Sequence, residues 1–171
     1  MIKPIRKMGD PCLLKISDHI TKEEFGSQNL FDILADMEDT MRHLGGVGIA
    51  APQIGINKQV VIIEYYQKDI TRYQNIGDCP RKVIINPIIE AITEEEESFS
   101  EGCLSVPGLR GTVSRPKAIN YQYFDEYGNL HKGTDDSFFA RVMQHECDHL
   151  QGILYPMRMR DMSTLAFIDL D

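Results

Sequence analysis

The sequence predicts an α+β fold in which mainly antiparallel β-sheets pack around a central helix. β-branched runs cluster between residues 59 and 124, and two amphipathic segments with helical spacing flank this cluster at a distance. The second of these segments contains His-Glu-x-x-His and is expected to be the central helix. An N-terminal helix and a short C-terminal tail complete the predicted architecture.

Length and composition favour one globular domain spanning residues 1–171. The chain has 42% hydrophobic and 26% charged residues, and neither an internal repeat nor a Pro/Gly/Ser-rich linker divides it. The formal net charge is −8, so direct binding of nucleic acid is not predicted.

The features of an exported or membrane protein are missing from the sequence. Its first residues, MIKPIRKMGDPCLLKI, contain no apolar signal region, and no window approaches the ~18 apolar residues of a membrane span. The four cysteines show no CxxC pairing, which favours reduced thiols over disulfides. A cytoplasmic protein without membrane contact is therefore expected.

The N-terminal half predicts an irregular arm followed by a helix. Residues 2–16 lack periodicity, whereas apolar residues recur at helical spacing between Asn29 and Leu44. Asn29 is expected to cap this helix, and the pair Gly45-Gly46 is expected to end it.

The middle of the chain predicts strands and a hairpin. The runs rich in β-branched or aromatic residues are Gln59–Tyr65, Lys82–Ile85, Ile88–Thr93, Val113–Pro116 and Ala118–Phe124. The polar stretch 67–80 is expected to be a loop, and a hairpin should turn near Gly128. A second helix, over 138–150, can be capped by Asp135, Asp136 or Ser137, and residues 153–171 favour no structure.

Two histidines on this second helix predict half of a metal site. His145 and His149 are four residues apart and project from one helical face, so both can reach the same ion. Glu146 lies about 100° further round the helix, where it can act on bound water without ligating the metal. The alternative is a pair of polar histidines on a solvated helix, which the apolar residues Phe138 and Val142 on the same face make less attractive.

A cysteine is the first candidate for the third ligand, because thiolate binds divalent transition metals strongly. Cys103 lies in the bent segment SEGCLSVPG, whereas Cys147 should point away from the ligand face, and Cys12 and Cys79 have no local partners. A Cys/His/His set leaves one position open, where water acidified towards a pKa of ~7 would give a hydroxide. Together with Glu146, this predicts hydrolysis of a carbonyl compound.

The glycine-rich segment GGVGIAAPQIG, residues 45–55, fits neither phosphate-binding glycine motif. Small residues where two elements pack closely explain most of it. Gln53 is the exception, because its amide can donate a hydrogen bond to a developing oxyanion.

Three segments together resemble the peptide deformylase family. They are GVGIAAPQ at 46–53, EGCLS at 101–105 and QHECDHLQG at 144–152, and their order and separation also match. The resemblance covers nearly the whole chain and includes the early turn Gly9-Asp10-Pro11. Members of this family remove the formyl group from N-formylmethionyl peptides.

The resemblance implies a role for each motif residue. Cys103, His145 and His149 would hold one divalent metal, typically Fe²⁺, with Zn²⁺, Ni²⁺ or Co²⁺ as substitutes. Glu146 would take a proton from the metal-bound water and pass it to the departing amine. The Gln53 amide and the Leu104 backbone N–H would stabilise the oxyanion.

The resemblance also implies a substrate cleft for N-formylmethionyl nascent peptides. Val47 and Gly48 would line it and pair with the peptide in a strand-like way. The remaining substrate-contact candidates are Glu101, Gly102, Arg141 and Val142, and Phe138 could help to form the methionine pocket. Glu101, Asp148 and Arg115 are expected behind the metal ligands, with an Asp148–Arg115 pair bracing the helix.

The chain departs from the family pattern at one position and in its C-terminal segment. Many relatives carry an aliphatic residue where this chain has Arg141, which could narrow the pocket rim, favour an acidic group further along the peptide, or pair on the surface with a local carboxylate. Nineteen residues follow Gly152 and end in FIDLD, where bacterial relatives often have a longer basic helix implicated in ribosome docking. Transient ribosome contact is therefore expected only as an implication of the resemblance, and not through such a basic helix.

Two rival functions remain. A general HExxH metallopeptidase would cleave internal peptide bonds, but its usual third ligand is histidine or a carboxylate, and EGCLS disfavours it. A non-catalytic, metal-dependent scaffold protein would have no need of Glu146 and Gln53, and both are present. Other polar features are expected to be solvated or packing residues, namely His19, His43, His131, the run Glu94–Glu97, and Met157, Met159 and Met162.

Overall fold

The computed structural model describes residues 1–168 and confirms the α+β class, while the acidic end at 169–171 lies outside the described residues. The helices and strands are α1 (Gln28–His43), β1 (Gly48–Ala50), β2 (Val60–Tyr65), β3 (Cys79–Ala91), β4 (Glu96–Cys103), β5 (Val106–Pro116), β6 (Ile119–Phe124), β7 (Leu130–Asp135), α2 (Phe138–Leu150) and β8 (Ala166–Phe167). Short 3₁₀ helices span Pro11–Leu14, Ala51–Ile54, Gln67–Asp69, Tyr155–Arg158 and Met162–Thr164.

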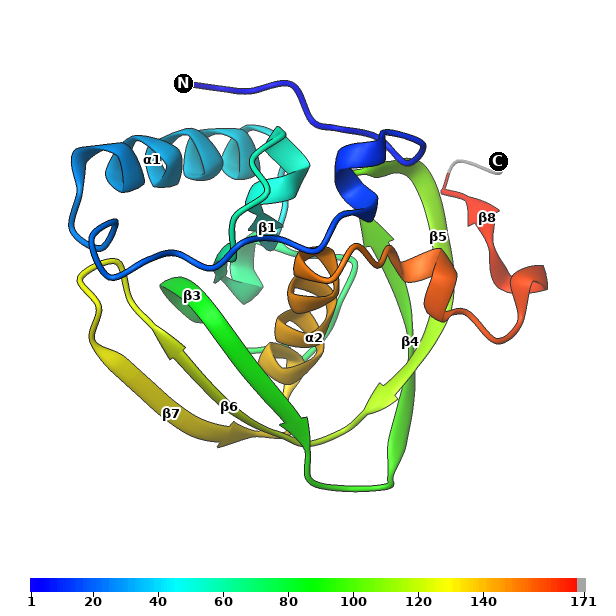
Figure 1. Ribbon diagram of the computed structural model, residues 1–171. Helices are drawn as coiled ribbons and strands as arrows, with labels where there is room; N and C mark the ends of the chain where they lie inside the picture. The colour runs from blue at the N-terminus through cyan, green and yellow to red at the C-terminus, as the bar shows by residue number, and fades with distance from the viewer. Residues whose placement is uncertain (169–171) are drawn as a thin grey trace.

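Two antiparallel sheets enclose helix α2. The larger has the strand order β1-β2-β3-β6-β7, and the smaller has the order β4-β5-β8. Figure 1 shows α2 in the middle of the molecule, between β3, β6 and β7 on one side and β4 and β5 on the other, with α1 across one end. The helix with the histidine motif is therefore central, as predicted.

Strand β2 lies at the centre of the hydrophobic core, because α1 covers one of its faces and α2 covers the other. Val60 and Ile62 pack in one apolar cluster with residues of α1, whereas Val61 and Ile63 pack in a second cluster with residues of α2. A strand covered on both faces is apolar without alternation. This explains the uninterrupted run VVII and places α2 firmly against the larger sheet.

Ser27, and not Asn29, caps α1, so the predicted cap was wrong. The Ser27 backbone is extended, and its hydroxyl accepts a hydrogen bond from the Leu30 N–H at 3.2 Å. Asn29 lies within the helix and cannot cap it. The end of the helix is as predicted, since Gly45 takes a left-handed φ of 66° there.

Helix α2 begins and ends where the sequence indicates. The Ser137 side chain caps it by accepting from the Phe139 N–H. The Asp135 carboxylate accepts from the N–H groups of Ser137 and Ala140, which satisfies another free donor of the first turn.

Two strand predictions require correction. The segment 82–85 and most of the segment 88–93 belong to one strand, β3, which ends at Ala91 and whose register shifts between Ile85 and Ile88. Asn86, with a left-handed φ of 49°, lies in this irregularity. Strand β4 was not predicted at all, because its sequence EESFSEGC lacks apolar alternation and forms a strand by pairing with β5.

Within residues 1–168 the structure contains no helix that is both long enough and apolar enough to cross a membrane.

Candidate metal centre and substrate cleft

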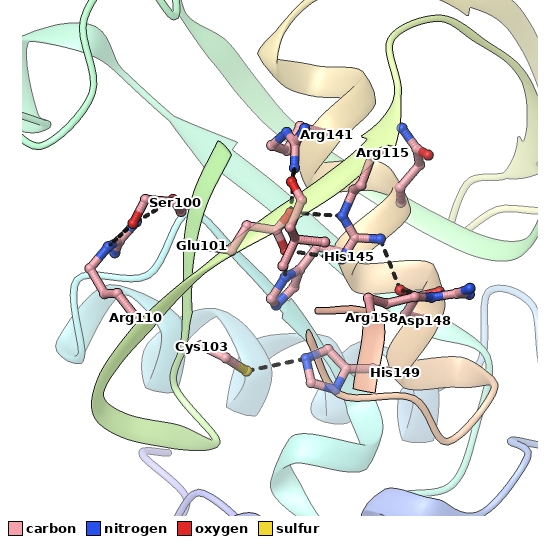
Figure 2. Close-up of polar contacts among 12 residues, drawn as sticks. Ser100, Glu101, Cys103, Arg110, Arg115, Arg141, His145, Asp148, His149 and Arg158 are labelled. Atoms are coloured by element: carbon pink, nitrogen blue, oxygen red, sulfur yellow. Dashed lines mark hydrogen bonds and ion pairs between the residues drawn. The ribbon is translucent and has the colours of Figure 1, made fainter. Parts of the chain in front are cut away.

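The structure brings the three predicted metal ligands together. Cys103 ends β4, and His145 and His149 lie one turn apart on α2. Their candidate ligand atoms all lie within 4.8 Å of one another, and the Cys103 Sγ is 3.4 Å from the His149 Nε2 (Figure 2). These three residues converge only because the C-terminal end of β4 meets α2, where Glu101 contacts both His145 and Arg141.

The donor set fits a divalent transition metal. One thiolate and two imidazoles are ligands that iron, zinc, nickel and cobalt accept. Beside them, the Glu146 Oε2 is buried and has no hydrogen-bond partner among the described residues. A buried polar atom without a partner is costly unless a bound group or water satisfies it. The cluster and the adjacent carboxylate are therefore consistent with a metal and a water.

Glu101 fixes the orientation of His145. Its Oε1 lies 2.8 Å from the His145 Nδ1, which leaves the Nε2 of the imidazole directed to the other ligands. The same carboxylate accepts hydrogen bonds from Arg115 and Arg141 (Figure 2). Burial alone would raise the pKa of Glu101, but the hydrogen bonds from His145 and Arg115 hold it well below its usual value.

A second carboxylate braces the helix behind the histidines. Arg115 donates to Asp148 at 2.9 Å, which confirms the predicted pair, and Arg158 donates to the same carboxylate at 2.9 Å. Arg115 therefore joins Glu101 on β4 to Asp148 on α2. This buried link holds the two elements that carry the ligands in a single arrangement.

Glu146 lies in a space that Gly48 leaves open. A Cβ atom on Gly48 would lie 2.6 Å from the Glu146 Oε1, so a side chain cannot fit there without moving the carboxylate. Burial raises the pKa of Glu146 to about 7. A carboxyl group with such a pKa can both accept and return a proton near neutral pH.

Replacing Gly48 by alanine is expected to lower kcat by about 10²-fold, because a misplacement of about 1 Å in a reacting group can have that effect. The added methyl group meets the movable end of a side chain rather than backbone, so the melting temperature and the metal content should change little. Steady-state kinetics, thermal melts and metal analysis of Gly48→Ala test this. An unchanged kcat would show that the close contact has no catalytic role.

The two predicted oxyanion donors flank the cluster. Gln53 is buried, with its Oε1 held by the Ala50 N–H, and its Nε2 donates to the Ser105 Oγ at 3.1 Å and lies 3.6 Å from the Cys103 Sγ. Leu104 follows Cys103 in the turn between β4 and β5. Both donors therefore lie next to the sulfur ligand.

A cavity of about 460 Å³ opens onto the cluster. The predicted residues that line it are Val47, Gly48, Glu101, Gly102, Cys103, Leu104, Phe138, Arg141, Val142, His145 and Glu146. Gln53 and His149 are not part of its lining. The lining is mainly apolar, and Phe138 packs against Tyr65, Tyr73 and Phe99.

Strand β1 presents a free edge to this cavity. The Val47 carbonyl accepts from the Glu64 N–H, so Gly48 opposite Ile63 forms a non-hydrogen-bonded pair. The peptide groups of Gly48 therefore point away from β2, toward the unpaired edge. An extended ligand can pair with them.

Arg141 is buried and lines the cavity, so of the alternatives left open for it, the surface arginine was wrong. Its Nη1 donates to the Glu101 Oε2 at 2.6 Å and to the Val113 carbonyl at 3.1 Å, and its guanidinium lies over the Phe99 ring. The partner carboxylate is 40 positions away in sequence. Arg141 thus forms part of the cavity wall and part of the hydrogen-bonding shell of Glu101.

Several lining residues were not predicted. They include Ile5 and Lys7 from the N-terminal arm, Arg72 and Tyr73 from the polar loop, Arg110 from β5 and Ile168 at the end of the described chain. Cys147 packs in the core, away from the ligands, as expected. No local pattern distinguishes the missed residues, because they reach the cavity only through chain segments that fold back over it.

Comparison with known proteins gives consistent matches. The model of the family described as polypeptide deformylase matches residues 2–164. The chain is 47% identical to peptide deformylase 1 of Nitrosomonas europaea, over 99% of this chain and 94% of the relative. It is 45% identical to peptide deformylase 2 of Ralstonia nicotianae, with the same coverage.

Solved structures agree with these matches. The crystal structure of the class I type b peptide deformylase from Acinetobacter baumannii with bound Met-Ala-Ser superposes with a TM-score of 0.88 at 35% identity, over 93% of this chain and 99% of that one. A Plasmodium falciparum peptide deformylase in complex with an inhibitor gives a TM-score of 0.78 at 31% identity, over 92% and 90% of the two chains. The chain is therefore an enzyme of the peptide deformylase family, which removes the N-formyl group from nascent peptides.

Proposed function

We propose that this enzyme hydrolyses the formyl amide of N-terminal formylmethionine in newly synthesised polypeptides and releases formate. The observation that carries the proposal is the Cys103/His145/His149 cluster beside the buried, unpartnered carboxylate of Glu146, at the inner end of the cavity. The cytoplasm is the compartment we propose, because these substrates are nascent chains. Transient contact with the ribosome stays a prediction.

Cys103, His145 and His149 would hold one divalent metal ion, with Fe²⁺ favoured and Zn²⁺, Ni²⁺ or Co²⁺ as substitutes. When bound, the ion supplies Lewis-acid activation of water and of the formyl oxygen. Glu101 holds His145 in the ligating orientation through its Nδ1. The Arg115–Asp148 pair would keep helix α2, which carries both histidines, in place when the metal binds.

Glu146 moves the proton in the proposed reaction. Its carboxylate takes a proton from the attacking water and returns it to the amine nitrogen as the C–N bond of the formyl amide breaks. The negative charge on the former carbonyl oxygen then needs donors that are already in place. The donors we propose are the Nε2 of Gln53, which lies 3.6 Å from the Cys103 Sγ, and the backbone N–H of Leu104, the residue after Cys103.

The cavity accounts for methionine as the first residue. Val47, Phe138 and Val142 supply an apolar surface, and Arg141 lines the same cavity. Gly102 and the free peptide groups of Gly48 allow the substrate backbone to lie close to the metal ligands. The Acinetobacter structure holds Met-Ala-Ser, which is the kind of peptide that deformylation would produce.

Two substrates distinguish this function from a general metallopeptidase. Formyl-Met-Ala should release formate in the presence of the metal, and an unblocked peptide of similar length should remain intact. Cleavage of internal bonds in the unblocked peptide, without formate release from the formylated one, would contradict the proposal. The same assay after chelation should show no turnover, and activity should return when Fe²⁺ is added without oxygen.

A further inference from the structure

Four arginine or lysine side chains line the cavity in a chain whose net charge is −8, and three of them are not paired with Glu101 as Arg141 is. Lys7 comes from the N-terminal arm, Arg72 from the loop between β2 and β3, and Arg110 from β5. We call these three residues the cationic rim. Within residues 1–168, none of the three forms an ion pair with a carboxylate. Their charges are therefore available to a ligand.

Tyr73 positions two of these cations. The Arg110 guanidinium lies 5.2 Å from the centre of the Tyr73 ring, and that of Arg72 lies 5.4 Å from it. Tyr73 donates from its hydroxyl to the Ser100 carbonyl at 3.1 Å, so the ring is tied to β4. Stacking on an aromatic ring holds a guanidinium in place without neutralising its charge.

Arg110 retains donors for a bound group. Its Nε donates to the Ser100 Oγ at 3.2 Å, and its Nη2 donates to the Ser100 carbonyl at 2.7 Å and to the Tyr73 hydroxyl. Its Nη1 makes no hydrogen bond among the residues that the structure describes. The backbone and hydroxyl partners are uncharged, so the positive charge of Arg110 is not compensated.

The other charged lining residues do not cancel this rim. Glu101 is buried and shared between two arginines and His145, and Glu146 is buried beside Gly48. Arg141 is already paired with Glu101. Among the residues that the structure describes, the exposed charged side chains of the cavity are therefore positive, although the protein as a whole is acidic.

In a bound substrate, the residues that follow the methionine would reach the cationic rim. Cys103, His145 and Glu146 line the less exposed part of the cavity, while Lys7 and Arg72 are exposed. An extended peptide advances about 3.3–3.6 Å per residue, so the first residues after methionine extend from the buried end toward solvent. Carboxylate side chains there can form charge-assisted hydrogen bonds with guanidinium groups.

We propose that the cationic rim gives this enzyme a preference for formylmethionyl peptides with Asp or Glu at the second or third position. The inference rests on the deformylase function proposed above and adds a substrate class to it. Lys7, Arg72 and Arg110 bind the downstream carboxylates, and their role is specificity rather than chemistry. The preference should therefore appear in KM, with kcat nearly constant.

The test uses amidated peptides, which removes the charge of the peptide's own C-terminus. Formate release by the metal-loaded enzyme is measured with two sets of peptides. The first set is formyl-Met-Ala-Glu-amide, formyl-Met-Ala-Gln-amide and formyl-Met-Ala-Lys-amide. In the second set, Glu, Gln or Lys follows methionine directly. In one set or both, kcat/KM should be highest for Glu and lowest for Lys, with a total range of roughly fivefold to tenfold. In 1 M salt, where the Debye length is about 3 Å, the ratio of kcat/KM between the Glu and Lys peptides should fall to near unity.

Arg72→Gln and Lys7→Gln should each reduce the preference for Glu over Lys through KM, and the double variant should reduce it further, leaving only the part that Arg110 supplies. Lys68→Gln is the matched control: it lies in the same loop and loses the same charge, but Lys68 does not line the cavity. Equal kcat/KM for Glu and Lys peptides in both sets, or an equal effect of Lys68→Gln, would overturn the inference and leave the deformylase function intact. No formate release from any of these peptides would overturn both.

Discussion

Glu146→Gln is expected to lower kcat for formate release by about 10²–10⁴-fold while the protein keeps one divalent metal per chain. Glutamine has nearly the shape of glutamate, so the contact with Gly48 is preserved. It cannot accept the proton of the attacking water, and it cannot deliver that proton to the leaving amine. The variant therefore separates proton transfer from metal binding.

Metal content and turnover must be measured on the same anaerobic preparation. Glu146→Ala should behave similarly, with the added cost of a cavity, while Glu90→Gln on the exposed face of β3 should retain normal kcat. Wild-type turnover in Glu146→Gln would show that Glu146 does not move the proton.

Cys103→Ala is expected to lose the metal and, with it, activity. Changes to residues that only orient metal ligands typically reduce affinity by 10- to 100-fold, and the loss of a ligating thiolate should exceed about 100-fold. The two histidines that remain are neighbours on one helix and leave the ion open on the side of β4. Metal analysis and titration with Zn²⁺ or Co²⁺ measure the effect directly.

Cys147→Ala is the matched control for this loss. Cys147 lies between the two histidines in sequence, but its side chain packs in the core cluster with Leu150 and Phe139. This variant should therefore keep its metal, with at most a modest decrease in melting temperature. A full equivalent of metal in Cys103→Ala, or its loss in Cys147→Ala, would contradict the ligand assignment.

The parts of the fold that were predicted correctly are those with local causes. The apolar periodicity of α1 and α2 and the run of β2 depend on neighbours within a few residues. Strand β4 has no such pattern, and it is a strand because β5 satisfies its backbone. The cap of α1 shifted by two positions because Ser27, like Asn29, is a good cap, and sequence alone does not decide between them.

In the candidate site too, residues with a local sequence pattern were predicted, and residues without one were missed. Two histidines at helical spacing with a glutamate between them, a cysteine in a bent segment and a glutamine after a glycine-rich stretch are recognisable from the residues alone. The resemblance to deformylases joins them into one set. Arg72, Tyr73 and Arg110 were missed because neither the polar loop nor β5 carries a local signal of proximity to the metal ligands.

The sequence by itself determined which groups could perform the chemistry, because the side chains of His145, Glu146 and His149 are related by the local geometry of one helix. Only the tertiary structure decided how those groups are supported. Arg141 is buried against Glu101 across 40 positions, and Gly48 on strand β1 leaves room for the Glu146 carboxylate on helix α2. Such contacts depend on how sheets and helix pack after distant segments meet, and no pattern within a few residues encodes them.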